Sequence, residues 1–295
     1  MTEIFGVPTQ ALFGQLLIGL INGSFYALLS LGLAVIFGLL NIINFAHGAQ
    51  YMLGAFCAYF LLNKAGLGYW WSLAIAPLVI GAVGVLIERT MLRHLYKLDH
   101  LYGLLLTFGL ALIIQGVFRH EFGSSGLPYP IPLELAGGRN LGFMFLPNYR
   151  AWVIVASLLV CLATWFVIEK TKLGSYLSAA TENPQLVQAF GINVPRMIML
   201  TYGFGVGLAA LAGVMAAPIY QVSPQMGADL IIVVFAVVVI GGMGSILGSI
   251  VTGFGLGIIE GLTKVFYPEA SNTVIFIIMA IVLMIKPAGL FGSQK

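Results

Sequence analysis

The sequence predicts an all-α protein, a polytopic transmembrane helix bundle with eight to ten spans. Of its 295 residues, 60% are apolar and only 8% are charged, whereas a soluble globular chain carries about 25% charged residues. No Asp, Glu, Lys or Arg occurs between Glu3 and Lys64, and a helix of that length is roughly three times as long as the ~30 Å hydrocarbon core. This stretch therefore crosses the membrane at least twice, or crosses once and re-enters.

Apolar segments recur along the chain, and each is expected to be helical because lipid cannot hydrogen-bond free backbone groups. These segments are 11–40, 42–62, 71–87, 102–118, 151–168, 199–218, 229–260 and 273–286. The segment 229–260 is interrupted by a glycine-rich stretch at 241–245. We therefore predict a broken helix at Gly241-Gly242, whose exposed helix ends would suit a polar solute at mid-membrane.

Basic residues between the spans predict the orientation, because cytoplasmic loops are enriched in Lys and Arg. On this ground the loops 88–101 and 169–198 and the C-terminal tail are assigned to the cytoplasm. The Pro- and Gly-rich segment 119–150 and the short loop 219–228 are then outside. Residues 1–295 are interpreted as a single transmembrane domain.

Polar side chains at membrane depth are the candidates for a solute path. Asn and His are costly there unless they are paired or face a water-lined path. Hydrogen bonding between neighbouring helices is the competing interpretation, and the residues alone leave both open. No second ligand accompanies His47 at helical spacing, so a metal role is not expected. The candidates for the path are Asn22, Ser24, Asn44, His47, Thr107, Gln115, Gly241 and Gly242.

Small residues recur every four positions after the glycine-rich stretch. Residues at this spacing lie along one stripe of a helix, where they allow a close approach of a second helix. We therefore interpret the stripe as a packing surface. Its members are Ser245, Ser249, Gly253, Gly257 and Gly261.

A short helix is predicted within the cytoplasmic loop at 178–198. Asn183 followed by Pro184 is typical of a helix start, and Gly191 is typical of a helix end. The helix is too short to cross lipid or to be stable alone, so it must dock against another surface. The bilayer surface and a groove on a soluble partner are both compatible with the spacing. Its predicted apolar face consists of Leu186, Val187 and Phe190.

The sequence does not contain the motifs that are typical of several kinds of chemistry. There is no phosphate-binding Gly-x-x-x-x-Gly-Lys-Ser/Thr loop, so the chain does not bind ATP in that way. Neither a His-Glu-x-x-His metal pair nor a Gly-x-Ser-x-Gly nucleophile turn occurs, which disfavours a membrane enzyme. No basic run indicates nucleic acid. If ATP powers this protein, another subunit must supply it.

Taken in order, these segments resemble the branched-chain amino-acid ABC importer permeases of bacteria. Each motif is modest singly, but together they cover nearly the whole chain. The matching residues are Gly23-Ser24-Phe25-Tyr26-Ala27-Leu28, Asn44-Phe45-Ala46-His47-Gly48, Thr107-Phe108-Gly109-Leu110, Glu182 to Ile192, Ile240-Gly241-Gly242-Met243-Gly244-Ser245 and Lys286-Pro287-Ala288-Gly289-Leu290-Phe291-Gly292.

The resemblance implies a permease domain in the bacterial inner membrane that works with other proteins. An extracytoplasmic solute-binding protein would deliver the solute, a second related permease subunit would complete the path, and two cytoplasmic ABC ATPase subunits would hydrolyse ATP. The chain itself would be no enzyme and bind no cofactor. Ser178 departs from the family, where Arg is expected, which puts a salt bridge there in doubt. The residues implied to couple to the ATPase are Glu182, Leu186, Val187, Ala189, Phe190 and Gly191.

The solute and the energy source have alternatives. The resemblance implies branched-chain or related amino acids, and urea or short amides are the alternative solutes within the same family. An ion-coupled secondary carrier is the alternative from another class, and it predicts carboxylates embedded in the membrane. Glu88, Asp229 and Glu260 lie near the ends of predicted spans. Their surroundings in the structure therefore bear on this alternative.

Overall fold

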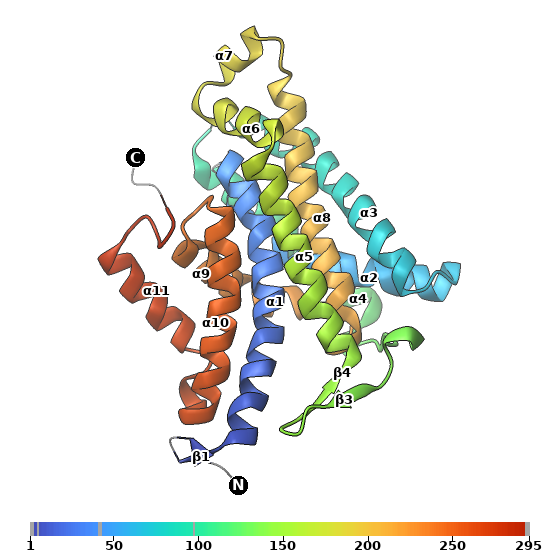
Figure 1. Cartoon of the computed structure of the whole chain (residues 1–295). Coiled ribbons are helices and arrows are strands. Elements are labelled where there is room, and N and C mark those ends of the chain that lie inside the picture. Colours follow the sequence, from blue (N-terminus) through green and yellow to red (C-terminus); the bar gives the residue numbers. More distant parts are fainter. Residues whose placement is uncertain (1–2, 5, 41–42, 97, 293–295) are drawn as a thin grey trace. The chain divides into compact units, whose positions relative to one another are not determined.

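The computed structural model describes residues 3–4, 6–40, 43–96 and 98–292, and α-helices dominate it (Figure 1). Short 3-10 helices are η1 (Leu92–His94), η2 (Leu133–Leu135) and η3 (Pro268–Ala270). Four short strands are β1 (Glu3–Ile4), β2 (Val7–Pro8), β3 (Gly138–Asn140) and β4 (Phe145–Pro147). The helices are α1 (Thr9–Leu40), α2 (His47–Ala65), α3 (Tyr69–Thr90), α4 (His100–Phe122), α5 (Asn148–Lys170), α6 (Lys172–Glu182), α7 (Pro184–Ala189), α8 (Val194–Tyr220), α9 (Met226–Gly241), α10 (Ile246–Phe266) and α11 (Val274–Ile285).

The helical membrane bundle is confirmed, but eight to ten spans are not. Among the described residues, six helices are long and apolar enough to cross a membrane: α1, α3, α4, α5, α8 and α10. The apolar helices α9 and α11 have 16 and 12 residues. At 1.5 Å per residue they measure about 24 Å and about 18 Å, less than the ~30 Å hydrocarbon core.

The first half of helix α2 is buried in protein. Nearly all residues from His47 to Ala58 are buried. Because protein groups face them, these residues include hydrogen-bonding side chains such as His47 and Gln50. Lipid contact selects for uniform apolarity, whereas burial against protein does not. The burial of α2 in protein is therefore compatible with the polar residues that it carries.

The chain forms two compact units. Unit 1 comprises residues 1–30, 131–161 and 233–295, and unit 2 comprises residues 31–130 and 162–232. Unit 1 thus holds most of α1 and α10, and unit 2 holds α2, α3, α4 and α8.

In unit 1, α1 and α10 pack with their backbones in contact. A Cβ atom on Gly257 would overlap the carbonyl oxygen of Gly19, and Gly261 is packed equally closely against Gln15. Further along, the Ser30 hydroxyl donates to the Ser249 carbonyl oxygen at 3.2 Å. The contacts run in opposite directions along the two helices, so the pair is antiparallel. The predicted packing stripe from Ser245 to Gly261 is confirmed.

The break at Gly241-Gly242 exists, but it is a turn between antiparallel helices. Helix α9 ends at Gly241 and α10 begins at Ile246. The Thr252 hydroxyl on α10 lies 3.3 Å from the Val237 carbonyl oxygen on α9, and a Cβ on Gly241 would lie 2.7 Å from Gly248. The two helices therefore fold back on each other. The prediction of helix ends exposed at mid-membrane within one span is wrong, because glycines permit a hairpin as readily as a broken helix.

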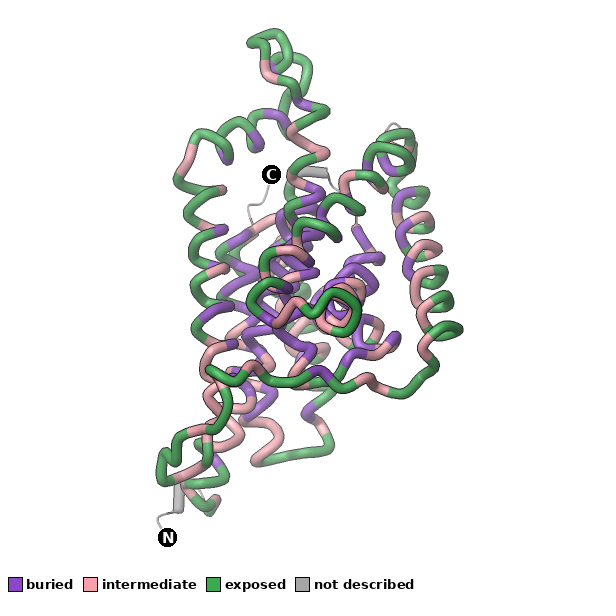
Figure 2. The backbone as a smooth tube through the Cα atoms, turned by 90° about the vertical axis from the view of Figure 1, so that its right-hand side faces the viewer, coloured by how far each residue is buried: buried purple, intermediate pink, exposed green. Residues whose placement is uncertain are grey.

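In unit 2, α8 packs closely against α2 and α3. Any side chain on Gly54 of α2 would overlap the backbone of Ala210, and any on Gly213 would overlap Tyr51. On α3, a Cβ on Gly81 would lie 3.0 Å from the Gly203 carbonyl oxygen. Figure 2 shows buried residues along the interior helices, whereas the segment at the top, which carries α7, is almost entirely exposed. Small residues therefore allow the close approach of α8 to α2 and α3.

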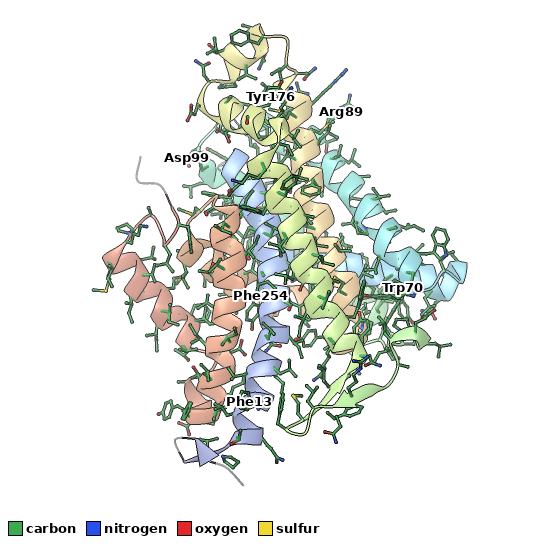
Figure 3. The ribbon with its side chains drawn as sticks, in the orientation of Figure 1. Phe13, Trp70, Arg89, Asp99, Tyr176 and Phe254 are labelled. Atoms are coloured by element: carbon green, nitrogen blue, oxygen red, sulfur yellow. The ribbon has the colours of Figure 1, made fainter. Side chains whose placement is uncertain are left out.

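The arrangement within unit 2 agrees with the predicted orientation. Tyr176 on α6 and Arg89 near the end of α3 lie toward one end of the unit, and Trp70 lies toward the other (Figure 3). At this second end, Leu127 and Val222 exchange backbone hydrogen bonds of 2.8 and 2.9 Å. The enrichment of cytoplasmic loops in basic residues agrees with the position of Arg89, whereas Arg119 in the last turn of α4 lies at the other end.

Two antiparallel hairpins in unit 1 were not predicted from the sequence. In the larger one, Gly138 pairs with Pro147 and Asn140 pairs with Phe145. The turn between them is stabilised by the Asn140 side chain, which accepts from the Gly142 amide at 2.9 Å. Strands this short carry no usable alternation of apolar and polar residues, so only the glycine-rich turn marks them.

Replacing Gly257 by Ala should destabilise the protein more than replacing Gly255 by Ala. The new methyl group at residue 257 meets the backbone of α1, whereas no atom lies within 4 Å of a Cβ at residue 255. Overpacking costs about 1–3 kcal/mol, and both changes carry the same gain in helix propensity. The unfolding midpoints of the two purified variants in detergent measure the difference. Equal midpoints would contradict the close α1–α10 contact.

Candidate functional site

A buried polar network in unit 2 surrounds the non-helical segment between α1 and α2. The Asn44 side chain is fully buried. Its Oδ1 accepts from the Ala46 amide at 3.1 Å, and its Nδ2 donates to Gln50 Oε1 at 3.0 Å. Gln50 Nε2 in turn donates to the Tyr202 hydroxyl at 3.4 Å. The network therefore connects the start of α2 to α8.

Thr107 attaches the same segment to α4. Its hydroxyl oxygen accepts from the Phe45 amide at 3.2 Å, and the hydroxyl lies 3.3 Å from the Ile43 carbonyl oxygen. The Phe45 ring meets the Phe108 ring edge to face, with centroids 6.1 Å apart. Backbone groups that leave a helix in an apolar region need such partners. Thr107 supplies them, so the non-helical turn is stable inside the bundle.

The network lies inside the membrane-spanning part of unit 2. Thr107 is the eighth residue of α4 and Tyr202 the ninth of α8. Each therefore lies about 10–12 Å along its helix from the end assigned to the cytoplasm. At that depth, polar groups indicate either a structural network or a route for a polar solute.

The remaining predicted path residues of unit 2 are placed less centrally or packed differently. His47 is buried, and its ring lies against α1, where a Cβ on Gly32 would be 3.0 Å from its Cε1 atom. Gln115 is half-buried, further along α4 than Thr107. The structure thus brings Asn44 and Thr107 to one segment and places His47 directly after it. Gln50 and Tyr202 belong to the same network and were not predicted, because their partners are distant in sequence.

The other predicted path residues belong to unit 1. Ser24 is fully buried, and its hydroxyl donates to the Leu20 carbonyl oxygen of its own helix at 2.9 Å. Asn22 is half-buried on the same helix. Gly241 and Gly242 are buried at the turn between α9 and α10.

The C-terminal tail covers the turn between α9 and α10. The amides of Leu290 and Phe291 donate to the carbonyl oxygens of Ile240 and Gly241 at 2.8 and 3.0 Å. Gly242 and Gly289 have φ values of 103° and 81°, and a Cβ on Gly289 would lie 2.5 Å from Gly242. The tail thus satisfies carbonyl groups that the end of a helix leaves without partners. Both motifs were noted in the sequence, but their contact was not predicted.

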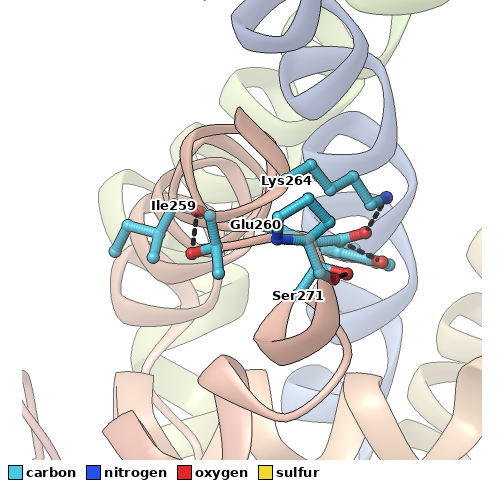
Figure 4. Close-up of polar contacts among 7 residues, drawn as sticks. Ile259, Glu260, Lys264 and Ser271 are labelled. Carbon is cyan, nitrogen blue, oxygen red and sulfur yellow. Dashed lines mark hydrogen bonds and ion pairs between the residues drawn. The ribbon is translucent and has the colours of Figure 1, made fainter. Parts of the chain in front are cut away.

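The carboxylates near the span ends are either hydrogen-bonded to protein groups or exposed to solvent. Glu260 is only 5% exposed, and it accepts from the Tyr26 hydroxyl at 2.7 Å and from the Lys264 ammonium at 2.5 Å (Figure 4). Glu88 is buried and accepts from the Tyr96 hydroxyl at 2.7 Å, whereas Asp229 is exposed. Burial, and then the hydrogen bond to Glu88, raise the pKa of Tyr96, so this phenol keeps its proton at neutral pH.

The short cytoplasmic helix forms as predicted at both ends. Asn183 Oδ1 accepts from the Leu186 amide at 3.0 Å, Pro184 is the first residue of α7, and Gly191 has a φ of 83°. The preceding helix α6 was not predicted. Its glycine and serine content gives a weak helix signal, although Leu177 and Ala180 mark a buried face.

The predicted apolar face of α7 is divided in the structure. Val187 is buried and packs with Ala180 of α6 and Val194 of α8. Leu186 and Phe190 are 54% and 78% exposed. Val187 therefore fixes α7 to its neighbours, whereas Leu186 and Phe190 of the predicted apolar face stay exposed. Glu182, Ala189 and Gly191 are exposed.

The described part of the chain holds no group of three or more His, Cys, Asp or Glu residues placed to bind a metal ion. The polar network contains amide and hydroxyl groups, which exchange hydrogen bonds with one another. Such groups suit recognition of a small polar solute and leave covalent chemistry without a nucleophile or base.

Replacing Asn44 by Ala should destabilise the protein, whereas replacing Asn63 by Ala should have little effect. The first change removes the Asn44 partner of the Gln50 Oε1 atom and of the Ala46 amide in a buried region, which costs about 1–3 kcal/mol. Asn63 lies near the end of α2, where it is exposed and donates to the Tyr59 carbonyl oxygen of its own helix. Unfolding midpoints in detergent measure both effects. A tolerated Asn44→Ala change would show that the network is dispensable.

Replacing Gly289 by Ala should destabilise the protein more than replacing Gly66 by Ala. Both glycines have positive φ, with values of 81° and 67°, so both changes carry about 1–2 kcal/mol of backbone strain. Only at residue 289 does the methyl group also collide with Gly242, whereas the space around Gly66 is open. Proteolysis of the tail and unfolding midpoints test this. Equal effects would argue against the tail contact.

Comparison with known proteins assigns this architecture to a family. A family model described as "Branched-chain amino acid transport system / permease component" matches residues 15–283. The chain is 30% identical over 308 residues to the high-affinity branched-chain amino acid transport system permease protein LivH of Escherichia coli strain K12, which covers 100% of this chain and 99% of that protein.

More distant relatives extend the match. The chain is 28% identical to LivM of the same Escherichia coli strain, over 92% of this chain and 68% of LivM. It is 29% identical to the probable branched-chain amino acid transport permease protein LivH of Methanocaldococcus jannaschii, over 92% of this chain and 90% of that protein. No solved structure matches the chain. With a family model covering most of its length, the chain belongs to the branched-chain amino acid transport system permease family.

Proposed function

We propose that the chain is the membrane subunit of an ABC importer that carries branched-chain or related amino acids across the bacterial inner membrane. The family supports permeation, and six long apolar helices support a multi-pass membrane protein. The sequence has no phosphate-binding loop, so ATP is hydrolysed by separate ATPase subunits. The observation that carries the coupling is α7, which presents Leu186 and Phe190 to solvent on a loop assigned to the cytoplasm.

The exposed side of α7 is the surface that docks on the ATPase. A large aromatic side chain entering a pocket is typical of the few residues that dominate an interface. Glu182, Ala189 and Gly191 are exposed beside Leu186 and Phe190. Val187 has the opposite role, because it holds α7 on the permease through Ala180 and Val194.

A series of contacts in unit 2 supports a route from the proposed docking surface to the proposed solute path. Val187 contacts Val194, the first residue of α8, and Tyr202 lies two turns further along that helix. Tyr202 bonds to Gln50, which bonds to Asn44 in the segment between α1 and α2. When the ATPases close and displace α7, α8 transmits the movement to this segment. Asn44, His47 and Thr107 are then the best-supported path residues, and Asn22, Ser24, Gln115, Gly241 and Gly242 remain candidates.

The partners are a second related permease subunit, two ATPase subunits and an extracytoplasmic solute-binding protein. The presence of both LivH and LivM in Escherichia coli, each similar to this chain, supports a paired permease. Urea or short amides are the alternative solutes, because amide and hydroxyl groups around Asn44 accept several polar ligands. An ion-coupled carrier is less well supported, since the buried carboxylates of Glu88 and Glu260 are engaged in hydrogen bonds.

Reconstitution tests the proposed function directly. The permease pair, the ATPases and the binding protein are placed in liposomes, and uptake of labelled leucine and urea is compared with and without ATP. The proposal expects leucine uptake that requires ATP and the binding protein. Uptake by the purified chain alone, driven by an ion gradient, would contradict it.

Replacing Phe190 by Asp should abolish coupling while the protein still reaches the membrane. The change puts a charge on the centre of the proposed interface, which should lower ATP-driven uptake at least tenfold. Leu98→Asp is the matched control, because Leu98 is also an exposed apolar residue on a loop assigned to the cytoplasm. Uptake and co-purification of the ATPases are measured for both. Normal uptake by the Phe190 variant would remove the docking role.

A further inference from the structure

A groove in unit 2 opens between the end of α5, helix α6 and the start of α8. Its volume is about 270 Å³. Two residues from α5, two from α6 and four from α8 line it, and seven of these eight are apolar. Leu173, Leu200 and Phe204 are exposed at its opening. The groove therefore lies on the outer surface, at the end of the unit assigned to the cytoplasm.

The chemistry of the groove suits a hydrocarbon chain. Its one polar lining residue is Thr201, whose hydroxyl donates to the Met197 carbonyl oxygen of its own helix at 2.9 Å. The lining thus presents no polar group that would orient an amino acid. Apolar surface of this kind favours apolar ligand atoms.

Basic residues border the groove on its cytoplasmic side. Arg196 lies one turn before Leu200 on α8, and Lys170 lies one turn after Val167 on α5, so each follows a lining residue toward the same end. Lys172 is the first residue of α6, next to Leu173. All three are exposed, and Glu169 is the one opposing charge beside them in sequence.

Lys172 and Arg196 are the better placed of these cations for a ligand. The Lys170 ammonium lies 5.4 Å from the centroid of the Trp165 ring, a cation–π arrangement that directs it back onto α5. Long basic side chains at a helix end reach from apolar surface to the polar headgroup region. Arg in particular binds phosphate through two hydrogen bonds.

We propose that this groove binds an anionic phospholipid of the cytoplasmic leaflet. One acyl chain occupies the apolar groove, and the phosphate lies at the rim that carries Lys172 and Arg196. A zwitterionic lipid offers the same chain but no net negative charge, so the rim gives the site its selectivity. A second protein would have to supply counter-charges for this rim while it covered the groove, which makes lipid the better occupant.

A lipid in the groove would also stabilise the position of α7. Met197 lines the groove and packs against the cluster of Ala180, Val187 and Val194. A chain in the groove therefore contacts a residue that holds α7 in place. This inference goes beyond the proposed function, because lipid binding needs neither the ATPases nor a solute.

Lipid binding is measured on the purified full-length chain by native mass spectrometry. Phosphatidylglycerol and phosphatidylcholine with the same acyl chains are added at matched concentrations. We expect phosphatidylglycerol to be retained about 25-fold better, since each of the two basic residues near the lipid headgroup contributes about a factor of five. Equal retention of the two lipids would overturn the proposal.

Two sets of variants locate the site. The double change Lys172→Gln and Arg196→Gln should remove the preference for phosphatidylglycerol. The control is the double change Arg89→Gln and Arg93→Gln, which removes the same charge from exposed positions near the end of α3 and should preserve the preference. Leu200→Trp should fill the groove and lower retention of both lipids. An equal loss in the α3 control, or a Leu200→Trp variant that retains lipid normally, would overturn the site. A Leu200→Trp variant that loses only self-association would make the groove a protein interface instead.

Discussion

Backbone-to-backbone contact at glycine residues is the constraint on which both units depend. Lipid is as apolar as a leucine side chain, so helices in a membrane associate through close packing more than through the hydrophobic effect. In unit 2, Gly54 on α2 faces Ala210 on α8, and Gly213 on α8 faces Tyr51. In unit 1, Gly257 on α10 faces Gly19 on α1. A side chain at any of these glycines would force the helices apart and disrupt every polar contact that the close approach permits.

Two of the glycine-packed helix pairs also share a buried hydrogen bond. Gln50 reaches Tyr202 between α2 and α8, and Tyr26 reaches Glu260 between α1 and α10. Packing of small residues alone tolerates sliding along the helix axis, whereas a hydrogen bond in an apolar region has one favourable register. The paired Lys264 keeps the buried Glu260 carboxylate from being an uncompensated charge, whose cost would be several kcal/mol. The polar groups therefore set the register of helices that the glycines bring together.

Features encoded locally were predictable from the sequence, and features that depend on distant contacts were not. The apolar runs located the long helices within a few residues, and the Asn183 cap and the stripe ending at Gly261 follow from spacing alone. The turn after Gly241 was misread because the same glycines permit a broken helix and a hairpin. Gln50 and Tyr202 were not predicted to belong to the polar network, because nothing near either residue in sequence indicates its partner. For the same reason the sequence could not show that Val187 turns inward and that the tail covers the α9–α10 turn.

The packing of α8 decides how movement can pass through unit 2. Gly203 and Gly205 hold this helix against α3 and α1, and Gly213 holds it against α2. Because these contacts join backbones, α8 cannot slide past its neighbours without a clash. A displacement of its first residue would therefore move α8 together with the helices packed against it. The segment at 43–46 lacks helical structure, and side-chain contacts of Asn44, Phe45 and Thr107 attach it to its neighbours. In the proposed importer, a movement of α7 would therefore shift the packed helices together and deform this segment first. The polar side chains of the candidate path are found at the same segment.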